Sequence, residues 1–301
     1  MTTPLKSEIR GAISALVTPF INQEVDYTSL EKLVQYQLDH GIQGFVINGT
    51  TAESPTLTWA EVQKIYSVTR AIVGLKFPLI LGTGTNSTAS TIEFTKKASE
   101  LGADAALVVV PYYNKPPQRG LVEHFKLTAR ASDIPIILYN VPGRTITSLS
   151  QESIFELSET KNIIGLKEAS GDLSFDEALT NKLKKNFIML SGDDPTYIDF
   201  LRLGGHGIIS VMSNLLTEQT ARWTKQVLSG EVQQAKDDFK KYARLIQMMY
   251  CEANPIAIKW MLYKAELIAS PELRLPLSTL DIKFHLEISQ ELEKLQIIKS
   301  S

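Results

Sequence analysis

The sequence has very little cysteine: Cys251 is the only one among 301 residues. A single cysteine excludes a disulfide within the chain, and no cysteine or histidine spacing resembles that of a zinc site. Proteins of oxidising compartments commonly depend on disulfides for stability. We therefore expect a cytoplasmic protein that holds no metal.

Long apolar runs are also missing. Residues 105–110 form one of the longest, far below the roughly 20 residues of a membrane-spanning helix. The first 20 residues place an arginine before a short apolar stretch, but Ser14, Thr18 and Pro19 interrupt that stretch. We expect a first strand there rather than a signal peptide, and no association with a membrane.

Neither sign of charge is in clear excess. The formal net charge is -2, and lysine and arginine are spread along the chain. Nucleic-acid binding requires clustered positive charge, so we expect no such partner. The content of 44% hydrophobic and 21% charged residues is ordinary for a globular protein. No linker rich in proline, glycine or serine interrupts the chain, so we expect one compact unit.

What the sequence does contain is a series of short apolar runs rich in β-branched residues. They lack the alternation of a half-exposed sheet and fit strands of a parallel sheet that is covered on both faces. The runs are residues 12–17, 44–47, 79–81, 106–110, 136–138, 163–166, 188–190 and 207–211.

Helical patterns separate these runs. Leu30, Leu33 and Val34 fall on one face of a helix, and similar patterns occupy residues 62–73 and 92–101. Glycines placed as C-terminal caps follow four helical stretches, at Gly41, Gly74, Gly102 and Gly230.

The number of strand–helix units predicts the fold. About eight units fit within the first 230 residues, which favours a closed barrel. After Gly230 no strand candidate remains, and residues 232–250, 255–269 and 280–298 have helical patterns. We predict an α/β protein, a (β/α)8 TIM barrel at residues 1–230 with a C-terminal helical extension at residues 231–301.

An open nucleotide-binding sheet is the alternative. Residues 82–87 follow an apolar run and contain Gly82 and Gly84. They lack the third glycine of the dinucleotide fingerprint, and no acidic residue ends the next strand. The barrel is therefore the better prediction.

Polar side chains follow the predicted strands. In a (β/α) barrel the carboxyl ends of the strands meet at one mouth, where the active site lies. The candidates are residues 48–53 after the second strand, 111–114 after the fourth, Tyr139 on the fifth, Lys167 on the sixth and 191–193 after the seventh.

These residue types suit imine chemistry. Lys167 ends an apolar run, where desolvation favours the uncharged, nucleophilic amine, and Tyr139 could move protons beside it. The Thr50–Thr51 turn could hold a carboxylate through its backbone amides. Each feature also has a structural explanation: a buried phenol at Tyr139, helix caps at Thr50 and Thr51, and a surface ion pair at Arg144.

Other catalytic and metal sites are less well supported. The sequence has no Gly-x-Ser-x-Gly elbow and no His-Glu-x-x-His motif. Asp193 and Asp194 precede Pro195, and an acidic pair before proline is more typical of a helix cap than of a metal site. We therefore predict that Asp193 and Asp194 are structural and that Asp194 and Pro195 begin a helix.

Four motifs resemble those of the dihydrodipicolinate synthase / N-acetylneuraminate lyase family. The resemblance extends over nearly the whole chain from Gly11. The family motifs Gly-Thr-Thr-Gly-Glu, Tyr-Tyr-Asn-Lys-Pro, Tyr-Asn-x-Pro-Gly-Arg and Lys-Glu-Ala-Ser-Gly-Asp correspond to residues 49–53, 112–116, 139–144 and 167–172. Ala52 replaces the usual glycine of the first motif, which would be strained only if the position required a positive φ.

The resemblance implies a reaction. Lys167 is expected to form an imine with pyruvate, and the derived enamine then attacks L-aspartate 4-semialdehyde to give hydroxy-tetrahydrodipicolinate. Tyr139 would move the protons, linked through Thr50 to Tyr113 of a neighbouring subunit. The covalent imine requires no metal and no organic cofactor.

The resemblance also implies binding residues and an assembly. Thr51 would hold the carboxylate of pyruvate, Arg144 that of the aldehyde, and Gly192 and Ile209 would line the pocket through backbone atoms. A homotetramer built as a dimer of dimers is expected. Family members that bind lysine do so at a dimer interface, with residues corresponding to Ser54, Asn86 and Tyr112. Ser90 replaces a common glutamate there, so we expect weak or absent inhibition by lysine.

Two alternatives to this function stay open at the level of sequence. Another lyase of the same family, acting on a sugar acid or on N-acetylneuraminate, would share the imine and differ in the aldehyde; the Gly-Thr-Thr turn and Arg144 favour aspartate semialdehyde. A non-catalytic barrel that binds a keto acid would have no use for Lys167, Tyr139 and Thr50 together.

Overall fold

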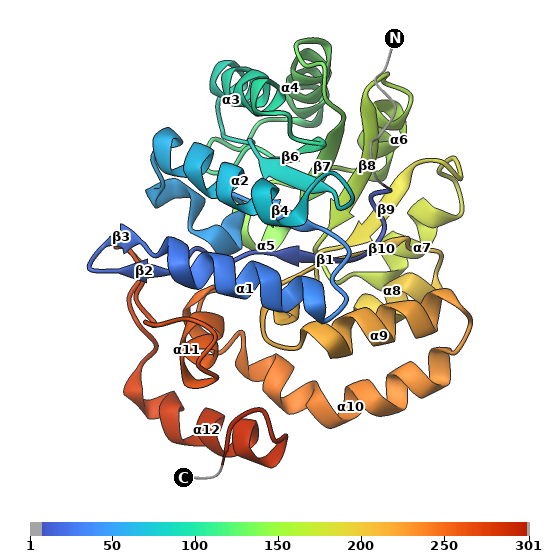
Figure 1. Cartoon of the computed structure of the whole chain (residues 1–301). Helices are drawn as coiled ribbons and strands as arrows, with labels where there is room; N and C mark the ends of the chain where they lie inside the picture. Colours follow the sequence, from blue (N-terminus) through green and yellow to red (C-terminus); the bar gives the residue numbers. More distant parts are fainter. Residues whose placement is uncertain (1–7, 300–301) are drawn as a thin grey trace.

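The computed structural model describes residues 8–299 and shows a closed barrel of parallel strands surrounded by helices (Figure 1). Residues 1–7 and 300–301, the outer ends of the two predicted regions, lie outside the described residues. In the described chain the barrel order is β1-β10-β9-β8-β7-β6-β5-β4, and β1 pairs with both β4 and β10. The TIM-barrel prediction is confirmed, and the open-sheet alternative is wrong.

Each predicted strand corresponds to an observed strand with bounds within two residues. The barrel strands are β1 Gly11–Ala15, β4 Phe45–Ile47, β5 Leu79–Gly82, β6 Ala105–Val109, β7 Ile136–Asn140, β8 Ile163–Glu168, β9 Ile188–Ser191 and β10 Gly207–Ser210. A short hairpin that the apolar runs did not predict, β2 Phe20–Ile21 with β3 Glu24–Val25, follows β1.

Helices connect the strands, and most of them cover the outside of the barrel. They are α1 Tyr27–Asp39, α2 Trp59–Val73, α3 Thr88–Leu101, α4 Gln118–Arg130, α5 Pro142–Thr145, α6 Gln151–Ser158, α7 Leu173–Thr180, α8 Tyr197–Arg202 and α9 Thr217–Leu228, with short 3-10 turns η1 Thr50–Ala52, η2 Ser54–Thr56 and η3 Met212–Asn214. The glycines predicted as caps, Gly41, Gly74, Gly102 and Gly230, follow α1, α2, α3 and α9 with positive φ.

Three helices follow the barrel: α10 Val232–Met248, α11 Ile256–Lys264 and α12 His285–Lys294, the last preceded by η4 Ile282–Phe284. Figure 1 shows α10 lying along α9, with α11 and α12 near the C-terminal end of the described chain. Among the described residues no strand follows Ser210, as expected. The helix predicted at residues 255–269 ends earlier, at Lys264, because Glu266 has a φ of 57° and leaves the helical conformation.

The region boundary at residue 230 stays a prediction. Helix α9 ends at Leu228 and α10 begins at Val232. The segment between α10 and α11 nevertheless returns to the mouth of the barrel, where Asn254 lies beside the turn η1. The C-terminal helices therefore form part of the same compact body as the barrel.

The core has two layers, one inside the barrel and one between the strands and the helices. Side chains alternate between them along each strand, so that Ile137 and Tyr139 point inward whereas Ile136 and Leu138 point outward. The inner cluster is Ile9, Ile13, Ala15, Val46, Ile80, Ala105, Leu107, Ile137, Tyr139, Val141, Ile188, Leu190 and Ile209. An apolar interior closes the barrel below the mouth and leaves the polar residues at its carboxyl end.

Candidate active site

Lys167 and Tyr139 are neighbours in the barrel wall. Their Cα atoms are register partners on the adjacent strands β8 and β7, and Lys167 is also level with Leu190 of β9. Tyr139 and Leu190 belong to the inner cluster, so Lys167 faces the interior with them. The Nζ atom lies 4.3 Å from the centroid of the Tyr139 ring, and each residue is 7% exposed.

The pair opens into a cavity of about 590 Å³ at the carboxyl ends of the strands. Among the described residues no carboxylate forms an ion pair with Lys167, because the neighbouring Glu168 points to the opposite face of the sheet and accepts a hydrogen bond from Asn140 at 2.8 Å. The amine is thus buried, close to a phenol and accessible from the cavity. The predicted grouping of Lys167, Tyr139, Thr50, Thr51, Arg144 and Gly192 is brought together in the lining of this one cavity.

Gly192 makes room for Lys167. It follows β9, and its N–H donates to the Glu168 carbonyl at 2.6 Å. A Cβ atom at this position would lie 2.7 Å from Lys167 Cε and 2.7 Å from Ala169 Cβ, closer than side-chain atoms pack. Ile209 is placed differently: it is 1% exposed in the inner core, and Val211, not Ile209, lines the cavity on the β10 side.

The Thr50–Thr51 turn lies in η1 and does not cap α2. Gly49 precedes η1, and Thr58 caps α2 in a capping box with Glu61. The structural explanation of the two threonines as helix caps is therefore wrong. Thr51 is 3% exposed, and its Oγ1 accepts a hydrogen bond from the Asn254 side-chain amide at 3.0 Å.

Ala52 fits the motif without strain. It is buried in η1, and it is absent from the residues with positive φ in the described chain. The left-handed conformation occurs one residue later, at Glu53, with a φ of 58°. Alanine can therefore replace the usual glycine at no conformational cost.

Arg144 lies at the rim of the cavity on α5. Its Nη2 donates to the Asn254 carbonyl at 3.2 Å, and its side chain is exposed. No carboxylate of residues 8–299 forms an ion pair with it, so the structural explanation of Arg144 as half of a surface ion pair is wrong. The guanidinium retains donors for a ligand anion.

Tyr113 does not reach the cavity of its own chain. It is 85% exposed, with a φ of 74°, and within residues 8–299 it forms no hydrogen bond with Thr50 or Tyr139. A proton relay through Tyr113 therefore requires a second chain.

The residues of the predicted lysine site are only partly brought together. Tyr112 is 39% exposed and lines a separate cavity of about 330 Å³ with Ser54. Asn86 is outside that lining, and its carbonyl accepts a hydrogen bond from the Asn114 side chain.

Asp194 does not begin a helix. Helix α8 starts at Tyr197 after Thr196, whereas the Asp194 carboxylate is 1% exposed and accepts hydrogen bonds from the Met212 N–H at 2.8 Å and the Tyr250 hydroxyl at 2.7 Å. The predicted cap is thus wrong, because the side chain points into the protein and accepts hydrogen bonds from the backbone N–H groups of Val211 and Met212 at the start of η3. Burial raises the pKa of Asp194. Burial and the charge of Asp194 raise the pKa of Tyr250 well above its ordinary value.

The sequence motifs missed the segment of residues 250–254, which lines the same cavity as Lys167. Tyr250 and Asn254 contact Asp194 and Thr51 across long sequence separations. The only signal in the sequence is a polar break between two helical patterns. Such a break predicts a loop but not the surface on which the loop packs.

No group of three or more side chains that could bind a metal together occurs in the described part of the chain. None of the described helices is long and apolar enough to cross a membrane.

Fold and geometry together are those of a (β/α)8-barrel protein with a buried lysine beside a tyrosine in its mouth. The model of the Dihydrodipicolinate synthetase family matches residues 8–295. The chain belongs to this family.

Named relatives are similar to this chain over nearly its full length. A 4-hydroxy-tetrahydrodipicolinate synthase of Bdellovibrio bacteriovorus is 48% identical over 96% of this chain and 99% of its own. The crystal structure of chloride-inhibited dihydrodipicolinate synthase from Acinetobacter baumannii complexed with pyruvate has a TM-score of 0.94 at 41% identity, covering 97% of this chain and all of that one. A monomeric dihydrodipicolinate synthase variant has a TM-score of 0.93 at 38% identity, with 96% and 97% of the two chains covered.

Proposed function

We propose that this chain is a 4-hydroxy-tetrahydrodipicolinate synthase that condenses pyruvate with L-aspartate 4-semialdehyde. The observation that carries the proposal is the buried amine of Lys167, 4.3 Å from the Tyr139 ring centroid and open to the cavity that Thr51 and Arg144 also line. The names of the relatives support the same reaction. The product belongs to the diaminopimelate route to lysine.

The proposed reaction begins at Lys167. Its uncharged amine adds to the ketone carbon of pyruvate, and loss of water gives an imine. Loss of a methyl proton converts the imine into an enamine, whose carbon forms the new bond to the aldehyde carbon of the second substrate. The amino group of that substrate then attacks the imine carbon, closes the ring and displaces Lys167, which regenerates the enzyme.

Tyr139 is the proposed proton donor and acceptor. Its ring borders the Lys167 amine, so its hydroxyl belongs to the same enclosed space as the reacting carbons. Thr50 lines the cavity and would orient the phenol. Tyr113 of a neighbouring subunit would complete the relay, which accounts for a tyrosine that is 85% exposed in the single chain.

Binding of the two carboxylates would be divided between the Thr50–Thr51 turn and Arg144. Thr51 and the backbone amides of its turn would hold the carboxylate of pyruvate, with Gly192 leaving the space beside Lys167 free. Arg144 at the rim would bind the carboxylate of the aldehyde, since a planar guanidinium can donate to two oxygens at once. For Ile209 we retain only a role in the core beneath the site.

The proposed chemistry needs neither a metal nor an organic cofactor, because the imine itself stabilises the carbanion. The proposed assembly is a homotetramer, a dimer of dimers in which Tyr113 crosses the tight interface. A single free cysteine, Cys251, is consistent with the cytoplasmic location that we propose.

Borohydride trapping tests the central step. We expect incubation with pyruvate and borohydride to attach a reduced pyruvate unit to Lys167, located by peptide mass analysis, and to abolish activity. The matched control is Lys161, an exposed lysine before β8, which should stay unmodified. Absence of an adduct on any lysine would overturn the proposed function in favour of a binding protein.

A substitution of Arg144 tests the identity of the second substrate. We expect Arg144→Ala to raise the KM for aspartate semialdehyde by about 10- to 100-fold, as expected for loss of a charge-assisted contact, while pyruvate still forms the adduct at Lys167. Arg130→Ala, at an exposed arginine that ends α4, is the control. Unchanged kinetics with aspartate semialdehyde in Arg144→Ala would point to a different aldehyde.

A further inference from the structure

A buried ion pair lies directly after the Thr50–Thr51 turn. Glu53 Oε1 and Lys259 Nζ are 2.7 Å apart, and both side chains are 0% exposed. Lys259 Nζ also donates to the Thr18 carbonyl at 2.8 Å. Burial lowers the pKa of Lys259 to about 8, although the Glu53 carboxylate opposes this shift. Neither side chain lines the cavity, so the pair cannot contact the substrate directly.

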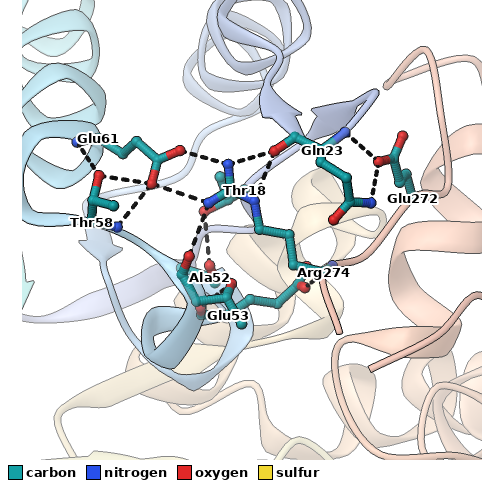
Figure 2. A network of polar contacts seen from close by, with 9 residues as sticks. Thr18, Gln23, Ala52, Glu53, Thr58, Glu61, Glu272 and Arg274 are labelled. Carbon is teal, nitrogen blue, oxygen red and sulfur yellow. Dashed lines mark hydrogen bonds and ion pairs between the residues drawn. The ribbon is translucent and has the colours of Figure 1, made fainter. Parts of the chain in front are cut away.

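The second oxygen of Glu53 is held by another segment. Glu53 Oε2 accepts a hydrogen bond from the Arg274 backbone N–H at 2.9 Å, and the Arg274 guanidinium contacts Glu61 at 2.6 Å and the Thr56 carbonyl at 2.9 Å. Figure 2 shows Arg274 in contact with both Glu53 and Glu61. The left-handed backbone at Glu53, with a φ of 58°, turns its carboxylate toward these partners.

Contacts from the C-terminal helical region therefore converge on residues 51–56, which include part of η1 and all of η2. Asn254 binds the Thr51 hydroxyl, Lys259 binds Glu53, and Arg274 binds both Glu53 and Thr56. From the barrel itself, the Thr18 hydroxyl donates to the Ala52 carbonyl at 2.9 Å. Residues more than 200 positions away in the sequence thus hold the Thr51 side chain and the residues that directly follow the turn.

Stability alone is a weak explanation of this ion pair. Burying two charges costs desolvation free energy, and replacing such a pair by apolar side chains is often neutral or stabilising. A charged, hydrogen-bonded pair also fixes the geometry of the contact, because each donor N–H and each acceptor oxygen tolerates only a narrow range of partner positions. Such a fixed geometry matters most where a backbone amide must point at a substrate.

We propose that Lys259 and Glu53 are positioning residues: their buried ion pair fastens the Thr50–Thr51 turn to helix α11 and so sets the affinity of the site for the carboxylate of a 2-oxo acid. The inference rests on the proposed function, because it takes pyruvate as the ligand of the turn. Lys259 of α11 then acts on binding without touching the substrate.

The test measures how much pyruvate is needed for borohydride trapping at Lys167. In Lys259→Met, whose side chain is close to lysine in volume, we expect the half-saturating pyruvate concentration and the KM for pyruvate to rise about tenfold, with kcat within about twofold, since the lost binding is shared by ground and transition states. Lys236→Met is the matched control, because Lys236 joins α10 to Asp199 at 2.6 Å and does not contact the turn.

A double variant separates positioning from folding. Lys259→Met alone leaves the Glu53 carboxylate buried without its partner, which can unfold the chain. Glu53→Gln with Lys259→Met removes both charges and keeps an oxygen for the Arg274 N–H. We expect this variant to show a melting temperature close to that of the original chain and yet a raised half-saturating concentration of pyruvate.

The outcomes are distinct. A folded double variant with unchanged pyruvate dependence would overturn the proposal, and so would a double variant that fails to fold, because the pair would then serve folding alone. An equal effect of Lys236→Met would also overturn it. Failure of the original chain to form any adduct would instead overturn the proposed function.

Discussion

At the scale of single residues, the site depends on the side chain of Lys167 and on the lack of a side chain at Gly192. Lys167 is buried against Tyr139, and the space for its stem exists because Gly192 has no Cβ. The requirement is steric and local. The strand end on which Lys167 lies could be predicted from its apolar run, whereas the close approach of Gly192 depends on the packing of β8 against β9.

Gly192→Ala tests this steric requirement. Its Cβ would meet Lys167 Cε at 2.7 Å, so the lysine side chain must shift from its place beside Tyr139. We expect kcat/KM to fall by about 100-fold, the effect expected for a misplacement near 1 Å, with little loss of melting temperature. The measurements are steady-state kinetics and thermal unfolding. Gly120→Ala, where a Cβ meets only ordinary contacts at 3.6 Å, should be fully active; full activity of Gly192→Ala would contradict the steric explanation.

At the scale of elements, β8 presents different chemistry on its two faces. Lys167 points into the barrel, and Glu168 points outward to Asn140 and toward helix α7. Asp176 of α7 is 2% exposed, and one of its carboxylate oxygens is buried without a hydrogen-bond partner. Burial, with the charge of Glu168 second, raises the pKa of Asp176 to about 7.

This arrangement predicts a dependence of stability on pH. Because the pKa of Asp176 is higher in the folded than in the unfolded chain, the folded state binds more protons, and stability is lost as the pH rises from about 4 to about 7. We expect Asp176→Asn to raise the melting temperature at pH 8 and to leave it unchanged at pH 3. Asp237→Asn, at an exposed aspartate of α10, should show no such difference. A lower melting temperature of Asp176→Asn at pH 8 would refute the assignment.

At the scale of the whole molecule, the exposed Tyr113 is the residue that the proposed assembly would use. Its side chain is 85% exposed, and it does not line the cavity that holds Lys167. An aromatic side chain held at a positive φ on a surface has a cost, and contact with a second chain would offset it. The assembly is therefore the scale at which the proposed proton relay can be tested.

Mixing experiments test whether Tyr113 crosses between subunits. Lys167→Ala and Tyr113→Ala chains should each be nearly inactive alone. After dissociation and reassembly together, a Lys167→Ala chain would supply its Tyr113 to the intact Lys167 of its neighbour. We expect activity that neither variant shows alone, with each variant reassembled with itself as the control. Absence of recovery, with mixed assemblies confirmed by mass spectrometry, would contradict a shared site.

The second cavity contains two of the residues, Ser54 and Tyr112, of the lysine site that the family resemblance implies. Its lining includes Ser54, Tyr112, Trp59 and Phe94 and contains no carboxylate. The ammonium groups of free lysine would lack an ionic partner there. We expect purified protein to keep most of its activity at millimolar lysine, measured at saturating pyruvate and semialdehyde. Steep inhibition, compared with ornithine as the control, would show the prediction wrong.

The sequence by itself determined the eight strands, the barrel and the residues at the strand ends, because continuous apolar runs and the polar residues that follow them are local patterns. Only the tertiary structure decided the rest of the site. It brought Asn254 to Thr51, and Lys259 and Arg274 to Glu53. It also turned Asp194 inward to Tyr250 and placed Ile209 below the cavity. Contacts between residues some 200 positions apart depend on how the C-terminal helices pack, and no local pattern encodes that packing.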